Sequence, residues 1–254
     1  MTDELLDLLT VLGFRAGREA LQALLTQLTK GHASPVQVVE QWLALERRER
    51  EVRNLASRTK KAALGSMKPA SDFDWQYPER ADEQLYDELL RLDFLANKQN
   101  ILFRGPAGVG KTTLAKNLGM RALERGHTVL FSNLSSALAE LLRQESLPAV
   151  ERRLRRYTAV DLLVLDELGY QPIDVRAVDL LFQIVSRRHE QASTIITTNL
   201  PFKDWPNIFP GAACLVPLVD RFTEHMIAFE VQGASYRQRE KPSGGPTGRA
   251  KRRR

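Results

Sequence analysis

The residues with the clearest chemical potential form one glycine-rich segment, Gly105-Pro-Ala-Gly-Val-Gly-Lys-Thr-Thr113. The segment satisfies G-x-x-x-x-G-K-[ST] and lies between an apolar run at 101–104 and an amphipathic run at 112–125. Such a turn directs consecutive N–H groups at phosphate oxygens, and the following helix adds its positive end. We expect Lys111 at the β and γ phosphates and Thr112 on Mg²⁺; the alternative is a turn without a ligand. The predicted nucleotide-binding residues are Gly105, Pro106, Ala107, Gly108, Val109, Gly110, Lys111, Thr112 and Thr113.

A second chemical feature is the pair Asp166-Glu167, which follows the apolar run Leu162-Leu-Val-Leu165. A parallel strand that ends at Asp166 would place this carboxylate at the sheet edge beside the phosphate loop. We expect Asp166 to hold Mg²⁺ through water and Glu167 to polarise an attacking water. Acidic residues also begin ordinary loops after strands, but the upstream glycine-rich segment favours the catalytic interpretation.

Three further polar residues are weaker candidates. Asn199 directly follows the run at 194–198 and is expected to orient water or contact the γ-phosphate, although Asn also commonly forms turns. Arg221 lies in a helix-like stretch after Pro217, and Arg237 lies in Ser235-Tyr-Arg-Gln-Arg239. One arginine is expected to stabilise charge on a transferred phosphoryl group and the other to contact the phosphates. Either arginine could equally be a surface charge.

The segments that would position these residues change character near residue 100. Before it, leucines at helical spacing predict helices, with breaks at Gly13 and 31–35, an N-cap at Ser34 and a further helix at 83–95. After it, short apolar runs alternate with amphipathic segments, which predicts an α/β fold with a parallel sheet covered by helices. The predicted strands are 101–104, 128–132, 161–165, 194–198 and 227–231. We expect a helical domain at 1–68, an α/β domain at 69–240 and a disordered basic tail at 241–254.

Composition restricts the classes of function. Among the 254 residues, no apolar run reaches the roughly 18 residues of a membrane span, and the acidic start lacks the positive region of a signal peptide. We expect a soluble, cytoplasmic protein with no membrane partner. Cys214 is the only cysteine, which excludes an internal disulfide. The histidines are far apart in the sequence, which predicts no zinc motif.

Positive charge gathers locally. The net charge of +6 equals the six basic residues that follow Glu240, so the rest of the chain is balanced. Any attraction to a polyanion such as DNA must therefore come from local clusters of Lys and Arg, and the sequence contains two of them. The same spacing also occurs on a merely solvated helix. The predicted DNA-contacting residues are Arg47, Arg48, Arg50, Arg53, Arg58, Lys60, Lys61, Arg152, Arg153, Arg155 and Arg156.

Five motifs occur in a characteristic order. They are Gly-Pro-x-Gly-x-Gly-Lys-Thr, Leu-Asp-Glu-Leu-Gly-Tyr170, Thr-Thr-Asn-Leu-Pro201, Val-Asp-Arg-Phe222 and Gly-Ala-Ser-Tyr-Arg-Gln-Arg239. Through these motifs the sequence resembles the IstB-like transposition helper ATPases, AAA+ proteins in the same branch as the DnaC helicase loaders and DnaA initiators. The likeness covers about residues 70–240. The helical N-terminal segment and Ser71-Asp-Phe-Asp-Trp-Gln76 also resemble the family's entry to the ATPase core.

The resemblance implies an AAA+ P-loop NTPase core preceded by a small helical domain. It implies ATP and Mg²⁺ as ligands, assembly into an oligomer on duplex DNA, and delivery of a transposase to a target site under control of ATP hydrolysis. It assigns Asn199 to the first sensor, Arg221 to a finger acting across a subunit boundary, and Arg237 to the second sensor. The tail at 242–254 and Trp205-Pro-Asn-Ile-Phe-Pro210 depart from the family pattern.

Two other functions stay open. A DnaC-like helicase loader would use the same core to remodel a replicative helicase and would bind single strands. A nucleotide-gated DNA-binding or scaffold protein would hydrolyse little ATP, although Asp166-Glu167 argues against it. A GTPase is disfavoured because no Asn-Lys-x-Asp segment follows the phosphate loop.

Overall fold

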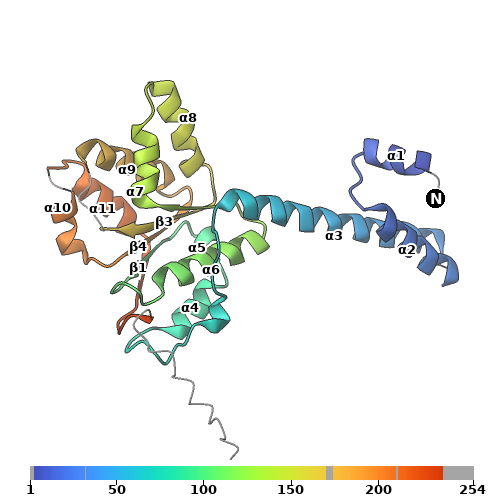
Figure 1. Cartoon of the computed structure of the whole chain (residues 1–254), viewed down its shortest axis with the longest axis horizontal. Helices are drawn as coiled ribbons and strands as arrows, with labels where there is room; N and C mark the ends of the chain where they lie inside the picture. The colour runs from blue at the N-terminus through green and yellow to red at the C-terminus, as the bar shows by residue number, and fades with distance from the viewer. Residues whose placement is uncertain (1–2, 32, 170–173, 210, 237–254) are drawn as a thin grey trace, which may run out of the picture.

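Five parallel strands form one sheet in the order β2-β3-β4-β1-β5 (Figure 1). The structure is a computed structural model and describes residues 3–31, 33–169, 174–209 and 211–236. The strands are β1 (Asn100–Arg104), β2 (Val129–Asn133), β3 (Leu162–Leu168), β4 (Ser193–Thr198) and β5 (Met226–Glu230). All five predicted strands are present, and each begins within one residue of its predicted start. Only β3 continues well beyond its predicted end.

Helices occupy the rest of the regular structure. The chain begins with α1 (Asp3–Val11), α2 (Arg18–Lys30) and α3 (Pro35–Ala62), followed by the 3₁₀ helix η1 (Ala70–Asp72), α4 (Glu83–Leu89) and α5 (Asp93–Ala96). Between and after the strands lie α6 (Lys111–Glu124), α7 (Leu134–Leu142), α8 (Leu147–Thr158), α9 (Val175–Arg188), η2 (Phe202–Asp204), α10 (Trp205–Ile208) and α11 (Leu215–Thr223). The single helix predicted at 83–95 is wrong, because Leu92 has φ +70° and separates α4 from α5.

Neighbouring residues of each strand contribute to cores on opposite faces of the sheet. Leu163 and Leu165 pack with side chains of α7, α8, α9, α10 and α11, whereas Leu162 and Val164 pack with those of α4, α5 and α6. Side chains alternate between the faces of a strand, so a sheet covered on both faces needs apolar residues at every position. This explains why the strands are continuous apolar runs in the sequence.

The N-terminal helices extend away from the sheet along α3 (Figure 1). The predicted N-cap is present: Ser34 and Gln37 form a capping box, and Pro35 opens the helix. The other end of α3 belongs to the core, because Ala62 is fully buried with α4, α5 and α6 side chains. The domain boundary near residue 68 stays a prediction, but α3 joins the two regions as one continuous helix.

A buried carboxylate holds the turn between α1 and α2 against α3. Glu46 accepts hydrogen bonds from the backbone N–H groups of Arg15 and Ala16 at 2.7–2.9 Å and from Arg50 Nε at 2.6 Å. Burial alone would raise the pKa of Glu46, but these hydrogen bonds outweigh it and the pKa lies below its ordinary value. The charged form of Glu46 therefore stabilises the packing of these helices.

None of the helices among the described residues combines the length and apolar character needed to cross a membrane. The predicted cytoplasmic location stays a prediction.

Candidate nucleotide site

The glycine-rich loop lies between the end of β1 and the start of α6, in the predicted strand–loop–helix context. Gly108 has φ +80°, and a Cβ there would lie 2.0 Å from Ser235 Oγ. Gly110 has φ +96°, and a Cβ there would lie 2.6 Å from a ring atom of Phe73. Both positions require glycine because the chain segments beyond β5 and before α4 pack directly on the loop.

A cavity of about 670 Å³ opens beside this loop. The predicted residues Ala107, Gly108, Gly110, Lys111, Thr112 and Thr113 line it, together with Glu167 and Asn199. Lys111 Nζ donates to the carbonyls of Gly105 and Pro106, each at 2.7 Å. Val109 instead belongs to the core, where it is almost fully buried. The cavity therefore holds most of the predicted nucleotide-binding residues in one place.

The predicted metal residues contact each other through oxygen atoms. Thr112 Oγ1 donates to Asp166 Oδ1 at 2.8 Å, and Thr197 Oγ1 at the end of β4 donates to the same carboxylate at 2.6 Å. Asp166 is only 5% exposed. Hydroxyl and carboxylate oxygens are the ligands that Mg²⁺ prefers, so the donor set fits this ion.

A β-bulge gives the adjacent Asp166 and Glu167 different surroundings. Leu165 pairs with Ile196 and Leu168 with Thr198, so two residues of β3 oppose the single residue Thr197 of β4. Glu167 adopts φ +66°, and its N–H donates to Thr197 Oγ1 at 2.9 Å. Asp166 is therefore buried beside Thr112, whereas Glu167 is exposed in the cavity.

The side chain of Asn133, which the sequence analysis missed, holds the carboxylate of Glu167. Asn133 Nδ2 donates to Glu167 Oε2 at 2.7 Å, while its Oδ1 caps α7 through the N–H of Ser136. The sequence signal was an Asn directly after the second apolar run, at the edge where parallel strands end. Thr197 was missed as well, although it is the next-to-last residue of the predicted strand 194–198.

The structure places one of the two candidate arginines, Arg221, and that side chain does not line this cavity. Arg221 lies on α11, bonds to Ser186 of α9 and has its guanidinium 4.9 Å from the ring centre of Phe182. It does not line the cavity of its own chain, and its finger role stays a prediction. Arg237 lies outside the described residues, as does the predicted tail.

The two basic clusters differ in how many of their charges are paired within the chain. In the α3 cluster, Arg50 bonds to Glu46, and Arg58 donates to the carbonyl of Leu123 at 3.1 Å. In the α8 cluster, Arg153 and Arg156 pair with Glu140, and Arg155 approaches Glu151. Arg47 pairs loosely with Glu51 at 3.8 Å. Among the predicted DNA-contacting residues, those that are exposed and form no ion pair with another described residue are Arg48, Arg53, Lys60, Lys61 and Arg152.

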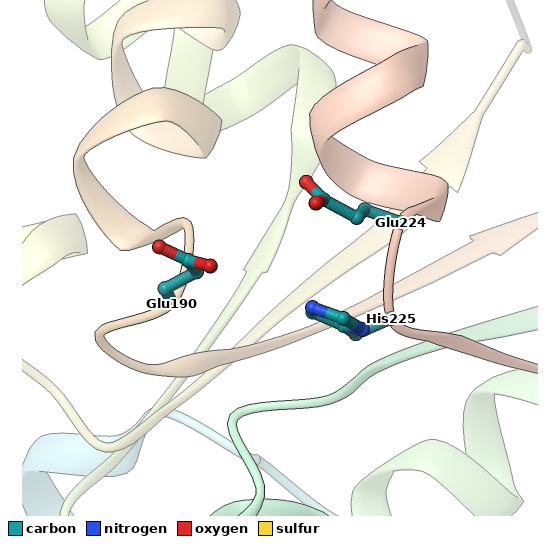
Figure 2. Close-up of side chains that lie close together, drawn as sticks. All are labelled: Glu190, Glu224 and His225. Atoms are coloured by element: carbon teal, nitrogen blue, oxygen red, sulfur yellow. The ribbon is translucent and has the colours of Figure 1, made fainter.

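A separate group of titratable side chains lies where α9 and α11 end, before β4 and β5 begin. Figure 2 shows Glu190, Glu224 and His225 turned toward a common space, and their ligand atoms lie within 4.8 Å of one another. His189 Nε2 is 2.6 Å from Glu224 Oε2. The fold thus brings His189 beside Glu224, which is distant from it in the sequence. All three grouped side chains are exposed, and this sheet edge is opposite the phosphate loop, so the group does not contribute to the nucleotide site.

Two solved structures illustrate the likeness of this fold to known proteins. The DnaI crystal structure matches 66% of this chain and 92% of its own, with a TM-score of 0.56 and 19% identity. Domain III of the Thermotoga maritima replication initiation protein DnaA matches 66% of this chain and 69% of its own, with a TM-score of 0.51 and 17% identity. At these identities the likeness concerns the fold alone, and it confirms the predicted α/β fold with a parallel sheet covered by helices.

Relatives with higher identity come from insertion sequences. A Pseudomonas aeruginosa protein named as an ATP-binding protein of insertion sequence IS21 is 34% identical over 225 residues, which cover 89% of this chain and 85% of the relative. A Geobacillus stearothermophilus protein named as an ATP-binding protein of insertion sequence IS5376 is 36% identical over 193 residues, covering 76% of this chain and 77% of the relative. The family model described as IstB-like ATP binding protein matches residues 8–244. The phosphate loop, its acidic partners and these similarities together show that the chain belongs to the IstB-like ATP binding protein family.

Proposed function

We propose that the protein is an ATPase that regulates DNA transposition. It oligomerises on duplex DNA, selects a target site and recruits or stimulates the transposase of the same element, and ATP hydrolysis controls its disassembly. The observation that carries the proposal is the arrangement of Lys111, Thr112, Asp166 and Glu167 at one sheet edge, around a cavity large enough for a nucleotide. The insertion-sequence origin of the relatives supports the link to transposition.

The loop binds the phosphates of ATP. Its backbone N–H groups and the start of α6 attract anionic oxygens, and Lys111 can exchange its bonds to Gly105 and Pro106 for phosphate oxygens. Thr112 and Asp166 hold Mg²⁺, which their convergent oxygen atoms fit. When bound, this ion would neutralise negative charge on the phosphates.

Glu167 provides the base that activates water. Its carboxylate is exposed in the cavity, whereas the buried carboxylate of Asp166 accepts hydrogen bonds from the hydroxyl groups of Thr112 and Thr197. A base must reach the water that it orients, and the bulge directs Glu167, but not Asp166, into the cavity. Asn199 lines the same cavity and contacts the γ-phosphate or the water.

Duplex DNA binds along the exposed basic side chains, chiefly those of α3. Arg48, Arg53, Lys60 and Lys61 are exposed and unpaired among the described residues, so they can approach DNA phosphates without losing an internal ion pair. Most of the α8 arginines would have to leave Glu140 or Glu151. We therefore favour α3 over α8 as the main contact with DNA.

The second candidate, a DnaC-like helicase loader, has support from the fold alone. Its core would be the same, and the similarity to DnaI does not extend to function at 19% identity. The relatives that share more than 30% identity are named for insertion sequences, which favours transposition.

Two substitutions test the nucleotide chemistry. Lys111→Ala should abolish ATP binding, because it removes the cation at the phosphate loop. Glu167→Gln should keep ATP binding but lower steady-state phosphate release about 100-fold or more, because it removes the base. Lys203→Ala is a control, since this exposed side chain on η2 lies outside the cavity. Full turnover in Glu167→Gln would contradict the assigned role.

DNA preference separates the two candidate functions. Filter binding of the ATP-bound protein to duplex and single-stranded oligonucleotides of equal length should show tighter binding to the duplex. Duplex DNA should also stimulate phosphate release. Preference for single strands, with no stimulation by duplexes, would favour the helicase loader.

A further inference from the structure

The chain between α3 and η1 crosses α6 before it reaches the nucleotide cavity. Leu64 is buried against α6, where a Cβ on Gly119 would lie only 3.2 Å from its Cδ2. Beyond this anchor, residues 66–69 and then Asp72 and Phe73 line the cavity. We refer to residues 66–73 as the wall segment. Phe73 at its end packs on Gly110 of the phosphate loop, and the rest of the segment lines a part of the cavity that neither the loop nor the sheet edge lines.

The side-chain amide of Asn117 on α6 holds the wall segment through both its oxygen and its nitrogen atom. Asn117 Oδ1 accepts from the N–H of Ala70 at 2.9 Å, and Asn117 Nδ2 donates to the carbonyl of Lys68 at 2.9 Å. The same Nδ2 donates to the carbonyl of Thr113, one turn back on α6, at 2.8 Å. The amide thus bonds an N–H and a carbonyl two residues apart, as a neighbouring strand would. A carboxylate or an alkyl side chain cannot make both bonds.

We propose that Asn117 is a positioning residue for the nucleoside part of ATP. It fixes the wall segment where that segment contacts the base and ribose, without touching the nucleotide itself. The inference rests on the proposed function: phosphates bound at the loop leave the nucleoside in the remainder of the cavity. The wall segment supplies Met67, Pro69 and Phe73 there, and such apolar side chains are typical of surfaces that bind bases.

Binding of ATP and of inorganic tripolyphosphate separates an effect on the wall from an effect on the loop. By isothermal titration calorimetry, Asn117→Ala should raise the Kd for ATP about ten-fold, as expected when a half-buried amide and its partners lose their hydrogen bonds. The Kd for tripolyphosphate should not change. Equal weakening of both ligands would overturn the proposal, because Asn117 would then act on the phosphate loop through Thr113. An unchanged Kd for ATP would overturn it too.

A second variant removes the same hydrogen bond from the other partner. Ala70→Pro removes the backbone N–H that donates a hydrogen bond to Asn117 Oδ1. The change lies at the first position of η1, where proline is tolerated. The preceding Pro69 already has φ −56° and ψ 150°, which suits a residue before proline. We expect the same selective loss of ATP affinity without any change on α6. Unchanged ATP binding in Ala70→Pro would contradict the assigned role even if Asn117→Ala failed to fold.

Two controls complete the comparison. Arg121→Ala changes a side chain one turn further along α6 that pairs with Glu124 at the surface, and it should leave both dissociation constants unchanged. Lys111→Ala should weaken both ligands together. If Lys111→Ala bound both as the wild type does, the proposed function would fail, whereas a loss confined to ATP in the Asn117 variant concerns the wall segment alone.

Discussion

The hydrogen bond between Asn133 and Glu167 restrains the side chain that is proposed to activate water. Asn133 Nδ2 donates a hydrogen bond to Glu167 Oε2 at 2.7 Å, so this oxygen already has a hydrogen-bond partner before any water binds. Asn133→Ser removes the amide that reaches Glu167 while keeping an oxygen that can cap α7. We expect phosphate release without DNA to rise roughly two- to ten-fold, the range that one hydrogen bond corresponds to.

Asn133→Asp serves as the matched variant, because it keeps the capping oxygen but cannot donate to Glu167 when ionised. It should also raise DNA-independent turnover. Lower turnover in both variants, with unchanged thermal stability, would mean that Asn133 orients Glu167 for catalysis instead of restraining it.

Some residues of the site could be predicted from the sequence and others could not. Lys111 and Thr112 follow from one local pattern, and Asp166 with Glu167 follows from a strand that ends in two acids. Asn133 acts only because β2 lies beside β3, which brings it to a residue 34 positions away. Local spacing does not contain that neighbour relation. The left-handed backbone of Glu167 likewise depends on Thr197 of another strand.

At the scale of elements, one buried arginine joins the end of α8 to the starts of β3 and β4. Arg188 is 1% exposed and donates to the carbonyls of Tyr157 and Ser193 and to other oxygen atoms around them. Burial lowers the pKa of Arg188 to about 10, although the charge of Asp161 acts in the opposite direction. The guanidinium therefore stays charged at neutral pH and satisfies carbonyls that the end of α8 leaves without partners.

Arg188→Met should strongly destabilise the protein. The methionine fills part of the space but leaves several buried carbonyls without donors, each of which costs about 1–3 kcal/mol. Urea unfolding followed by circular dichroism should show a much lower midpoint. Arg187→Met is the matched control, because the adjacent Arg187 pairs with Glu151 at the surface and such pairs contribute little. Equal shifts in the two variants would contradict the role assigned to Arg188.

Most helices and strands could be predicted from the sequence, because the features that determine them are local. Strands buried on both faces are continuous apolar runs, and the capping residue Ser34 acts within its own helix. The break at Leu92 was not readable, because a leucine at φ +70° has no sequence signal and persists only within the surrounding core. Arg188 gave no sign of burial either, since its partners are carbonyls contributed by other elements.

At the scale of the whole molecule, the nucleotide site is joined to the N-terminal helices by one path of chain. Glu46 holds the turn after α1 on α3, α3 ends in the core at Ala62, and the wall segment then lines the cavity. Exposed basic side chains lie on the same helix. DNA bound along α3 and nucleotide bound in the cavity would therefore contact two parts of one continuous segment.

Mixing two inactive variants tests whether the active unit contains more than one subunit. Arg221 packs on α9 and does not line the cavity of its own chain, so its proposed contact with phosphate requires a neighbouring copy. Arg221→Ala should bind ATP with normal affinity but lose DNA-stimulated turnover, since an arginine finger contributes about 10³-fold or more to the rate. Lys111→Ala should bind no ATP but retains an intact Arg221.

In a mixed assembly on duplex DNA, a Lys111→Ala subunit can supply Arg221 to the nucleotide site of an Arg221→Ala subunit. We therefore expect equimolar mixtures to recover DNA-stimulated phosphate release that neither variant has alone. A mixture that stays as inactive as its components, although both assemble on DNA, would place Arg221 outside the shared site.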